Sequence, residues 1–340
     1  MGWGIMRTVE WDDEKKVVKL IDQRVLPSDP PILECRTVSE LIDAIQTLAV
    51  RGAPAIGVAG AFGVVLSFKE SSTIEEARRK CDELKRARPT AVNLSWAIER
   101  VLAAVEDCES VDNAMEKSLD LAKRMAEEDV EINRAIGKMG AKLFEDGDRV
   151  LTHCNAGRLA CVDWGTALGV IRSCHEEGKR VFVIATETRP LNQGSRITAW
   201  ELMRDGIPVT LITDSSAAYL MRKGMIDKVI VGADRIVRDA VFNKIGTYSH
   251  AISAKRHGIP FYVAAPMSTF DLDHTEADIK VEERDGDELR YFKGIKNAPD
   301  GVDVLNFAFD ATPLELVDAI ITEKGILHPQ NGRIEVDRQI

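Results

Sequence analysis

The chain has 340 residues, with 45 Lys and Arg against 55 Asp and Glu, so its formal net charge is −10. This charge argues against a nucleic acid partner, which requires a basic surface, and 6% aromatic residues argue against stacking on bases. The apolar runs are too short to cross a bilayer, no secretory pattern opens the chain, and the six cysteines form no disulfide framework. We therefore expect a cytoplasmic protein with no membrane partner.

The first domain is predicted to be mainly helical, with a short antiparallel β start. Apolar alternation at Val9–Trp11 and Val17–Ile21 predicts two paired strands. A long helical periodicity then ends at Asp146-Gly147, which is a turn signal. We place the domain boundary there, so that the domains span 1–146 and 147–340.

Helices fill the rest of the first domain. Capping-box patterns at Thr37 and Thr73 predict two helix starts, and Pro54 stands in the first turn of a helix predicted over Ala55–Phe68. This helix carries a glycine every three residues, and each glycine lowers helix stability by ~1 kcal/mol. Close packing against another helix is the expected compensation. The glycines are Gly57, Gly60 and Gly63.

The second domain alternates strands and helices, which indicates an α/β fold with a Rossmann-like, doubly wound parallel sheet. The expected strands are Arg149–His153, Arg180–Ala185, Pro208–Thr213, Lys228–Val231, Pro260–Ala264 and Asp303–Phe307. The expected helices are Gly165–Glu176, Ser195–Asp205, Ser216–Lys223 and Gly246–His257. Residues 271–301 are charged and predict a surface excursion, and the chain after Gly325 has little core-forming content.

Ligands of such sheets bind outside the carboxyl ends of the strands, so the residues that follow each strand are candidates for a site. Cys154 follows the first strand. It is either an inert buried thiol or, if a helix starts soon after it, a thiol whose thiolate is favoured by the helix N-terminus. Strand alternation turns His153 away from Cys154, so we do not expect a Cys–His pair.

The later strands offer acidic candidates. Asp234 follows the fourth strand and is either a catalytic acid or a structural residue that caps a helix or pairs with Arg235. For Asp214, after the third strand, we favour the N-cap of the next helix. Glu187 and Arg189, after the second strand, are either part of the site or a salt bridge across their loop.

The first domain offers one candidate anion site. Arg51, Gly52 and Ala53 lie directly before a predicted helix, where backbone N–H groups and the helix dipole favour an anion. The alternative is an ordinary turn between helices. Arg88 lies in a second such loop. No phosphate-binding loop of the familiar kinds and no spacing of metal ligands is found, so we expect no metal.

Taken together, these segments resemble the methylthioribose-1-phosphate isomerases over nearly the whole chain. The matching motifs are Arg51-Gly52-Ala53-Pro54-Ala55-Ile56-Gly57, Arg88-Pro89-Thr90-Ala91-Val92-Asn93, Thr152-His153-Cys154-Asn155-Ala156-Gly157, Glu187-Thr188-Arg189-Pro190, Gln193-Gly194, Gly232-Ala233-Asp234-Arg235 and Asn243-Lys244-Ile245-Gly246-Thr247. One departure is the turn before Asn243, which is one residue shorter than usual. The wider superfamily includes ribose-1,5-bisphosphate isomerases and the regulatory subunits of eukaryotic translation initiation factor 2B.

The resemblance implies isomerisation of 5-methylthio-D-ribose 1-phosphate to 5-methylthio-D-ribulose 1-phosphate in methionine salvage. The family's catalytic cysteine and aspartate fall on Cys154 and Asp234. Its substrate contacts fall on Arg51, Gly52, Ala53, Arg88, Gln193, Asn243 and Lys244. The resemblance also implies a homodimer.

The substrate carries its phosphate on the anomeric oxygen, so the sugar ring cannot open to a free aldehyde. An acid beside the ring oxygen suits Asp234, if a dry pocket keeps its carboxyl protonated. A group that handles a proton beside C1 and C2 suits Cys154. Either a cis-enediol route or a hydride shift is compatible with these residues, and no cofactor is required.

Two alternatives stay open. A ribose-1,5-bisphosphate isomerase would need a second phosphate site in place of an apolar methylthio pocket. A non-catalytic regulatory subunit of the initiation-factor type would need a partner surface but no acid or base. The presence of both Cys154 and Asp234 at their motif positions favours an enzyme.

Overall fold

The computed structural model describes residues 6–88 and 92–334 and divides into two compact units. The first contains the chain up to Arg134 together with Ala156–Gly165, and the second contains Ala135–Asn155 and the chain from Thr166. The second unit thus begins inside helix α5 (Val111–Gly140), upstream of the turn where the sequence places its boundary. Within the described residues, no helix is both long and apolar enough to cross a membrane.

The first unit opens with a three-stranded antiparallel sheet made of β1 (Val9–Asp12), β2 (Val17–Ile21) and β3 (Ile32–Cys35). The first two strands confirm the prediction, and the third was not predicted. Four helices follow, α1 (Val38–Gln46), α2 (Ala53–Lys69), α3 (Ile74–Lys85) and α4 (Val92–Ala104), and then α5. The capping box at Thr37 is complete, and the Thr73 hydroxyl accepts the Glu76 N–H.

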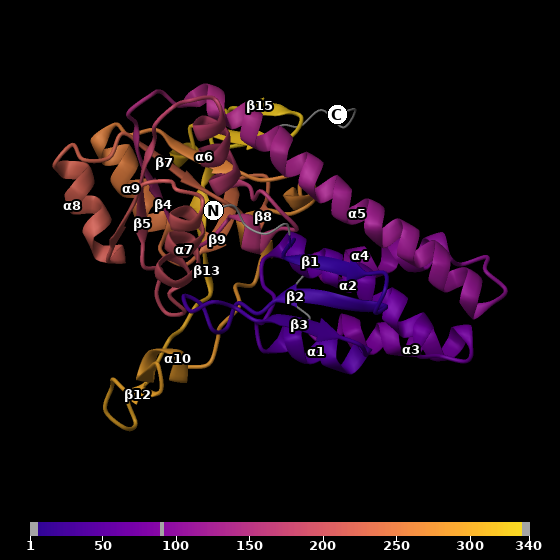
Figure 1. Ribbon diagram of the computed structural model, residues 1–340. Coiled ribbons are helices and arrows are strands. Elements are labelled where there is room, and N and C mark those ends of the chain that lie inside the picture. The colour runs from indigo at the N-terminus through magenta and orange to yellow at the C-terminus, as the bar shows by residue number, and fades with distance from the viewer. Residues whose placement is uncertain (1–5, 89–91, 335–340) are drawn as a thin grey trace. The chain divides into compact units, whose positions relative to one another are not determined.

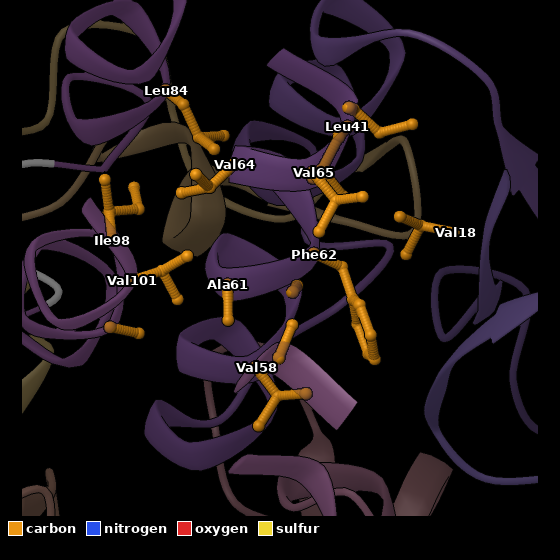
Figure 2. Close-up of a cluster of buried hydrophobic side chains, with 14 of the residues drawn as sticks. Val18, Leu41, Val58, Ala61, Phe62, Val64, Val65, Leu84, Ile98 and Val101 are labelled. Atoms are coloured by element: carbon orange, nitrogen blue, oxygen red, sulfur yellow. The ribbon is translucent and has the colours of Figure 1, made fainter. Parts of the chain in front are cut away.

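Helix α2 lies at the centre of this unit. Figure 2 shows Phe62 and Val65 on the side of α2 toward Val18 of β2, with Val64 on the side of Leu84. The glycines have the predicted role. A Cβ at Gly60 would lie 2.7 Å from a methyl carbon of Leu94 in α4, and one at Gly63 would lie 2.3 Å from a methyl carbon of Leu84 in α3. The missing side chains therefore let α3 and α4 approach α2 closely.

The second unit is built on a seven-stranded sheet in the order β15-β14-β10-β7-β4-β5-β6. Strands β7, β4 and β5 of this sheet are labelled in Figure 1. All neighbouring pairs are parallel except β14 with β15. The six parallel strands have the Rossmann order: β5 and β6 are added on one side of β4, and β7, β10 and β14 on the other, so the strand order reverses between β4 and β7. The strands are β4 (Arg149–Thr152), β5 (Phe182–Thr186), β6 (Val209–Ile212), β7 (Lys228–Val231), β10 (Phe261–Ala264), β14 (Ala319–Thr322) and β15 (Gly325–Leu327).

Helices cover both faces of the sheet, as predicted. Buried side chains of α8 and α9 pack with Leu151, Val229 and Val231 on one face, while the end of α5 contacts Val170 of α6 and Ile321 of β14. The helices are α6 (Ala167–Glu176), α7 (Ala199–Arg204), α8 (Ala217–Arg222) and α9 (Thr247–His257). The helical turns are η1 (Ala141–Leu143), η2 (Arg158–Ala160), η3 (Gly194–Thr198), η4 (Asp214–Ser216), η5 (Met267–Thr269), η6 (Glu276–Asp278) and η7 (Leu314–Leu316).

Two predictions for the end of the chain are wrong. Asp303–Phe307 is not a strand of the sheet: it follows the surface excursion as irregular chain, and Leu305 is 74% exposed. The sheet instead uses Ala319–Thr322, in which every residue is buried. The chain after Gly325 also contributes to the core, since β15 pairs with β14 and Ile334 is buried.

Between β7 and β14 the chain forms two smaller structures. One is an antiparallel sheet of β8 (Arg235–Ile236), β9 (Ala240–Lys244) and β13 (Phe309–Pro313), in the order β13-β9-β8. The other is the predicted excursion, an arm that carries α10 (Asp287–Arg290) and the hairpin of β11 (Tyr291–Phe292) and β12 (Ile295–Lys296) (Figure 1).

Candidate active site

Cys154 lies immediately beyond the carboxyl end of β4. It is partly exposed, whereas the other five cysteines are buried. Its φ of 66° is in the left-handed region, which is uncommon for a residue with a side chain. The helix start expected soon after Cys154 is wrong: the next helical turn is the three-residue η2, and α6 begins only at Ala167. The backbone of Cys154 is instead bonded to two threonines. Its N–H donates to Thr188 Oγ1 at 2.9 Å, and its carbonyl accepts from Thr198 Oγ1 at 2.6 Å.

The side chain of His153 is buried and hydrogen-bonds to Thr186 and Ile245. Its Nε2 lies 2.9 Å from the carbonyl oxygen of Ile245, which can only accept, so Nε2 carries the proton. Its Nδ1 then accepts from Thr186 Oγ1 at 2.6 Å, with His250 Nε2 at 3.2 Å. Burial lowers the pKa of His153 to about 4 and that of His250 to about 3. Both rings are therefore neutral near pH 7.

Asp234 lies beyond the carboxyl end of β7, the strand next to β4 across the point where the strand order reverses. Its N–H donates to the carbonyl of Phe242 at 2.9 Å, which places it beside Asn243 in the β8–β9 hairpin. The shortened turn closes normally, because the Val237 N–H donates to the Ala240 carbonyl. Arg235 pairs with Asp271 at 3.5 Å. The side chain of Asp234 is exposed, so the dry surroundings expected around it are not formed in this structure.

Asn243 and Lys244 are buried at the end of β9. The amide nitrogen of Asn243 donates to Thr247 Oγ1 at 3.0 Å, and the Lys244 ammonium lies 4.8 Å from the centre of the Phe309 ring. Because His153 bonds the carbonyl of Ile245, the Cys154 segment is fixed next to the Lys244 segment. The structure therefore brings Cys154, Asp234 and this lysine to one edge of the second unit, as the strand-end argument predicts.

Gln193 lies at the start of the π-helical turn η3. Its side chain is 6% exposed, and Oε1 has no hydrogen-bond partner among the residues that the structure describes. Next to it, a Cβ on Gly194 would lie 1.7 Å from the carbonyl oxygen of Thr186 and 2.8 Å from Thr188 Oγ1. Glycine at this position therefore lets η3 approach the end of β5 and the threonine that bonds Cys154.

The prediction that Asp214 caps α8 is wrong, because its carboxylate turns to the neighbouring loop. It accepts the N–H groups of Thr188 at 2.7 Å and Arg189 at 2.8 Å. The side chain of Arg189 donates to the carbonyls of Pro190 and Glu288, which does not favour the alternative that it bridges to Glu187. Sequence reasoning missed Thr188, and the only signal for it was its place in the Glu187-Thr188-Arg189-Pro190 motif.

The remaining predicted residues lie in the first unit. Gly52 has φ 91° and precedes α2, and a Cβ there would lie 2.3 Å from the carbonyl oxygen of Ala160. Arg51 and Ala53 are partly buried beside it, and the free N–H groups of α2 begin at this point. Arg88 is partly buried after α3, and the Pro89-Thr90-Ala91 part of its motif lies outside the described residues.

The strand order defines a Rossmann-like α/β protein, and the reactive residues beyond β4 and β7 define a candidate ligand site where that order reverses. The chain belongs to the initiation factor 2 subunit family, which matches residues 49–329. This finding confirms the resemblance inferred from the motifs.

Individual relatives carry two kinds of name. Methylthioribose-1-phosphate isomerase of Thermosipho melanesiensis is 52% identical over 330 residues, covering 95% of each chain. The crystal structure of 5-methylthioribose 1-phosphate isomerase from Pyrococcus horikoshii is 42% identical, with a TM-score of 0.89 over 96% of this chain and 93% of that one. A structure from A. fulgidus named translation initiation factor eIF-2B, subunit delta, is 57% identical, with a TM-score of 0.88 over 95% and 96% of the two chains.

Proposed function

We propose that this protein is an aldose–ketose isomerase that converts 5-methylthio-D-ribose 1-phosphate to 5-methylthio-D-ribulose 1-phosphate in the cytoplasm. The observation that carries the proposal is that Cys154 and Asp234 lie beyond β4 and β7, the two strands between which the strand order of the sheet reverses. Ligands of open α/β sheets bind at this point. The identity of the substrate is taken from the names of two relatives that are 42% and 52% identical to this chain.

In this proposal Asp234 donates a proton to the ring oxygen as the bond from that oxygen to C1 breaks. Hydrogen then moves from C2 to C1, and the C2 hydroxyl becomes the ketone as its proton passes, directly or through water, to the Asp234 carboxylate, which restores the acid. Cys154 acts beside these two carbons, on a proton or on developing charge. In this proposal the bound sugar covers the exposed carboxyl of Asp234, because desolvation favours the protonated form of a carboxyl.

The resemblance implies which residues contact the substrate, and we divide them between the phosphate and the sugar by their charge and hydrogen-bonding groups. We assign the phosphate to Arg51, Arg88 and Lys244, together with the backbone at Gly52 and Ala53, because guanidinium, ammonium and helix N–H groups bind phosphate strongly. Gln193 and Asn243 are assigned to the sugar hydroxyls. The buried Oε1 of Gln193 is an acceptor that a sugar hydroxyl would satisfy. No cofactor enters the scheme.

We expect the protein to act as a homodimer. Apolar side chains are exposed on the sheet's edge strand β6 and on α7, where Leu211 is 49% and Met203 is 71% exposed. An exposed edge strand with apolar neighbours favours association with another chain. Light scattering after gel filtration tests this, and a monomeric mass at micromolar concentration would contradict it.

A second candidate is a binding subunit of the initiation-factor type, and the name of the A. fulgidus structure supports it. A binding subunit needs no acid or base, so substitutions at Cys154 and Asp234 separate the two functions.

The test is turnover of the methylthioribose substrate by Cys154→Ser and Asp234→Asn. Each variant should lose at least ~10²-fold in turnover, the scale expected when a positioned acid or base is removed. Asp273→Asn, the same change at an exposed carboxyl of the excursion, is the control and should retain full turnover. Full turnover in both site variants would exclude these residues from the mechanism.

A further inference from the structure

Three residues with left-handed backbone lie together at the ends of β4 and β5. Cys154 has φ 66°, Thr188 has φ 63° and Asn192 has φ 57°. This conformation is disfavoured for any residue with a Cβ and most of all for a β-branched one such as threonine. Such residues persist only where the surroundings hold them, and they gather at functional sites.

Thr188 is held by its neighbours through both of its backbone groups. Its N–H donates to the Asp214 carboxylate at 2.7 Å, and its carbonyl accepts the Asn192 N–H at 2.8 Å. The side chain is fully buried. Its hydroxyl oxygen is therefore fixed at the point where it accepts the Cys154 N–H.

The carbonyl of Cys154 is fixed from another direction. The hydroxyl of Thr198 donates its one proton to the Cys154 carbonyl. The oxygen of the same hydroxyl accepts from the Asn155 amide nitrogen at 3.1 Å. The same amide nitrogen donates to Glu201, whose other carboxylate oxygen pairs with the buried Arg172 at 2.8 Å. The peptide groups on both sides of the Cys154 Cα are thus tied to buried partners.

We propose that Thr188 is a positioning residue for Cys154, anchored by Asp214, and that its hydroxyl keeps the cysteine in the left-handed conformation that presents the thiol at the end of β4. Thr188 and Asp214 follow strands at the same sheet edge but have no role in the proposed catalytic scheme, and this proposal gives them one. Its catalytic consequence rests on the proposed role of Cys154. A valine at 188 would keep the shape but leave the Cys154 N–H without its acceptor, so the backbone of Cys154 would relax.

The experiment compares Thr188→Val with Thr188→Ser, which restores the hydroxyl, and with Thr322→Val as a matched control. Thr322, the last residue of β14, is also fully buried, and its Oγ1 accepts from Lys324 and Gly325 and donates to the Gly325 carbonyl. Two readouts are measured on each folded variant: kcat and KM for the sugar phosphate, and the rate at which iodoacetamide alkylates Cys154, followed by peptide mass spectrometry. Because the other cysteines are buried, alkylation of the native protein reports on Cys154.

We expect Thr188→Val to lower kcat by ~10- to 100-fold with little change in KM, the effect of displacing a catalytic group by about 1 Å. The alkylation rate should change at least several-fold, Thr188→Ser should restore both values, and Thr322→Val should change neither. Wild-type kcat and alkylation in Thr188→Val would overturn the proposal, as would an equal loss in Thr322→Val. Full activity of Cys154→Ser would instead refute the catalytic role of the cysteine, while the alkylation rates would still decide whether Thr188 positions it.

Discussion

The most specific consequence of the site geometry concerns Gly194, which has no direct part in the proposed chemistry. In Gly194→Ala the new Cβ would lie 1.7 Å from the Thr186 carbonyl oxygen, although Cβ atoms essentially never come within 3.0 Å of such an atom. The start of η3 or the end of β5 must therefore move by more than about 1 Å. Either movement displaces Gln193 or Thr188, and a shift of about 1 Å at a site can lower the rate by about 10²-fold.

The assay is steady-state turnover of the methylthioribose substrate, with thermal unfolding measured in parallel. Overpacking should lower the free energy of unfolding by about 1–3 kcal/mol. Gly206→Ala is the matched control. Gly206 lies just beyond α7 with φ 72° and has no described atom near its Cβ position, so the change should cost only about 1 kcal/mol of backbone strain and leave turnover intact. Wild-type turnover in Gly194→Ala would refute the close approach of η3 to β5.

Three further predictions concern other groups. Burial raises the pKa of Asp129 from 3.8 to about 7, so between pH 4 and pH 7 the unfolded chain releases this proton while the folded chain keeps it. The free energy of unfolding should therefore fall by up to about 4 kcal/mol over this range, relative to that of Asp129→Asn. Urea unfolding of both proteins at pH 4.5 and pH 8 measures the change. Gln193→Leu should raise KM at least ~10-fold without lowering the melting temperature, because it removes a buried acceptor that no described residue satisfies. Arg51→Ala should mainly raise KM for the sugar phosphate, because it removes a phosphate contact.

Each of these has a contradicting result. A stability difference between wild type and Asp129→Asn that does not vary with pH would mean that the carboxyl is not desolvated in the folded state. An unchanged KM in Gln193→Leu would remove this side chain from the substrate site. An unchanged KM in Arg51→Ala would show that the start of α2 is not the anion site.

Much of the second unit could be predicted because its signals are local. Short β-branched runs bounded by polar residues predict buried parallel strands, and the carboxyl ends of such strands share one edge. This reasoning alone predicted that Cys154, Asp234 and Asp214 lie at the same edge of the sheet. It failed at Asp303–Phe307, because an apolar run does not reveal whether it is buried, and the sheet uses Ala319–Thr322 instead.

The supporting contacts of the site could not be predicted for a different reason. Thr188 acts through a left-handed backbone and through a carboxylate that follows another strand, and neither has a local sequence signal. Asp214 has the pattern of an N-cap, yet two N–H groups of the adjacent loop bind its carboxylate in the fold. Gln193 follows the second strand, but its role as a substrate contact came only from the resemblance, since a buried glutamine does not by itself indicate a ligand.

The central claim is the reaction, and the most direct test is to incubate the purified protein separately with 5-methylthio-D-ribose 1-phosphate and with ribose 1,5-bisphosphate, following each by NMR. We predict that the first is converted to 5-methylthio-D-ribulose 1-phosphate and the second is unchanged. Conversion of the bisphosphate alone would contradict the substrate assignment, and conversion of neither by the folded protein would contradict the assignment as an isomerase.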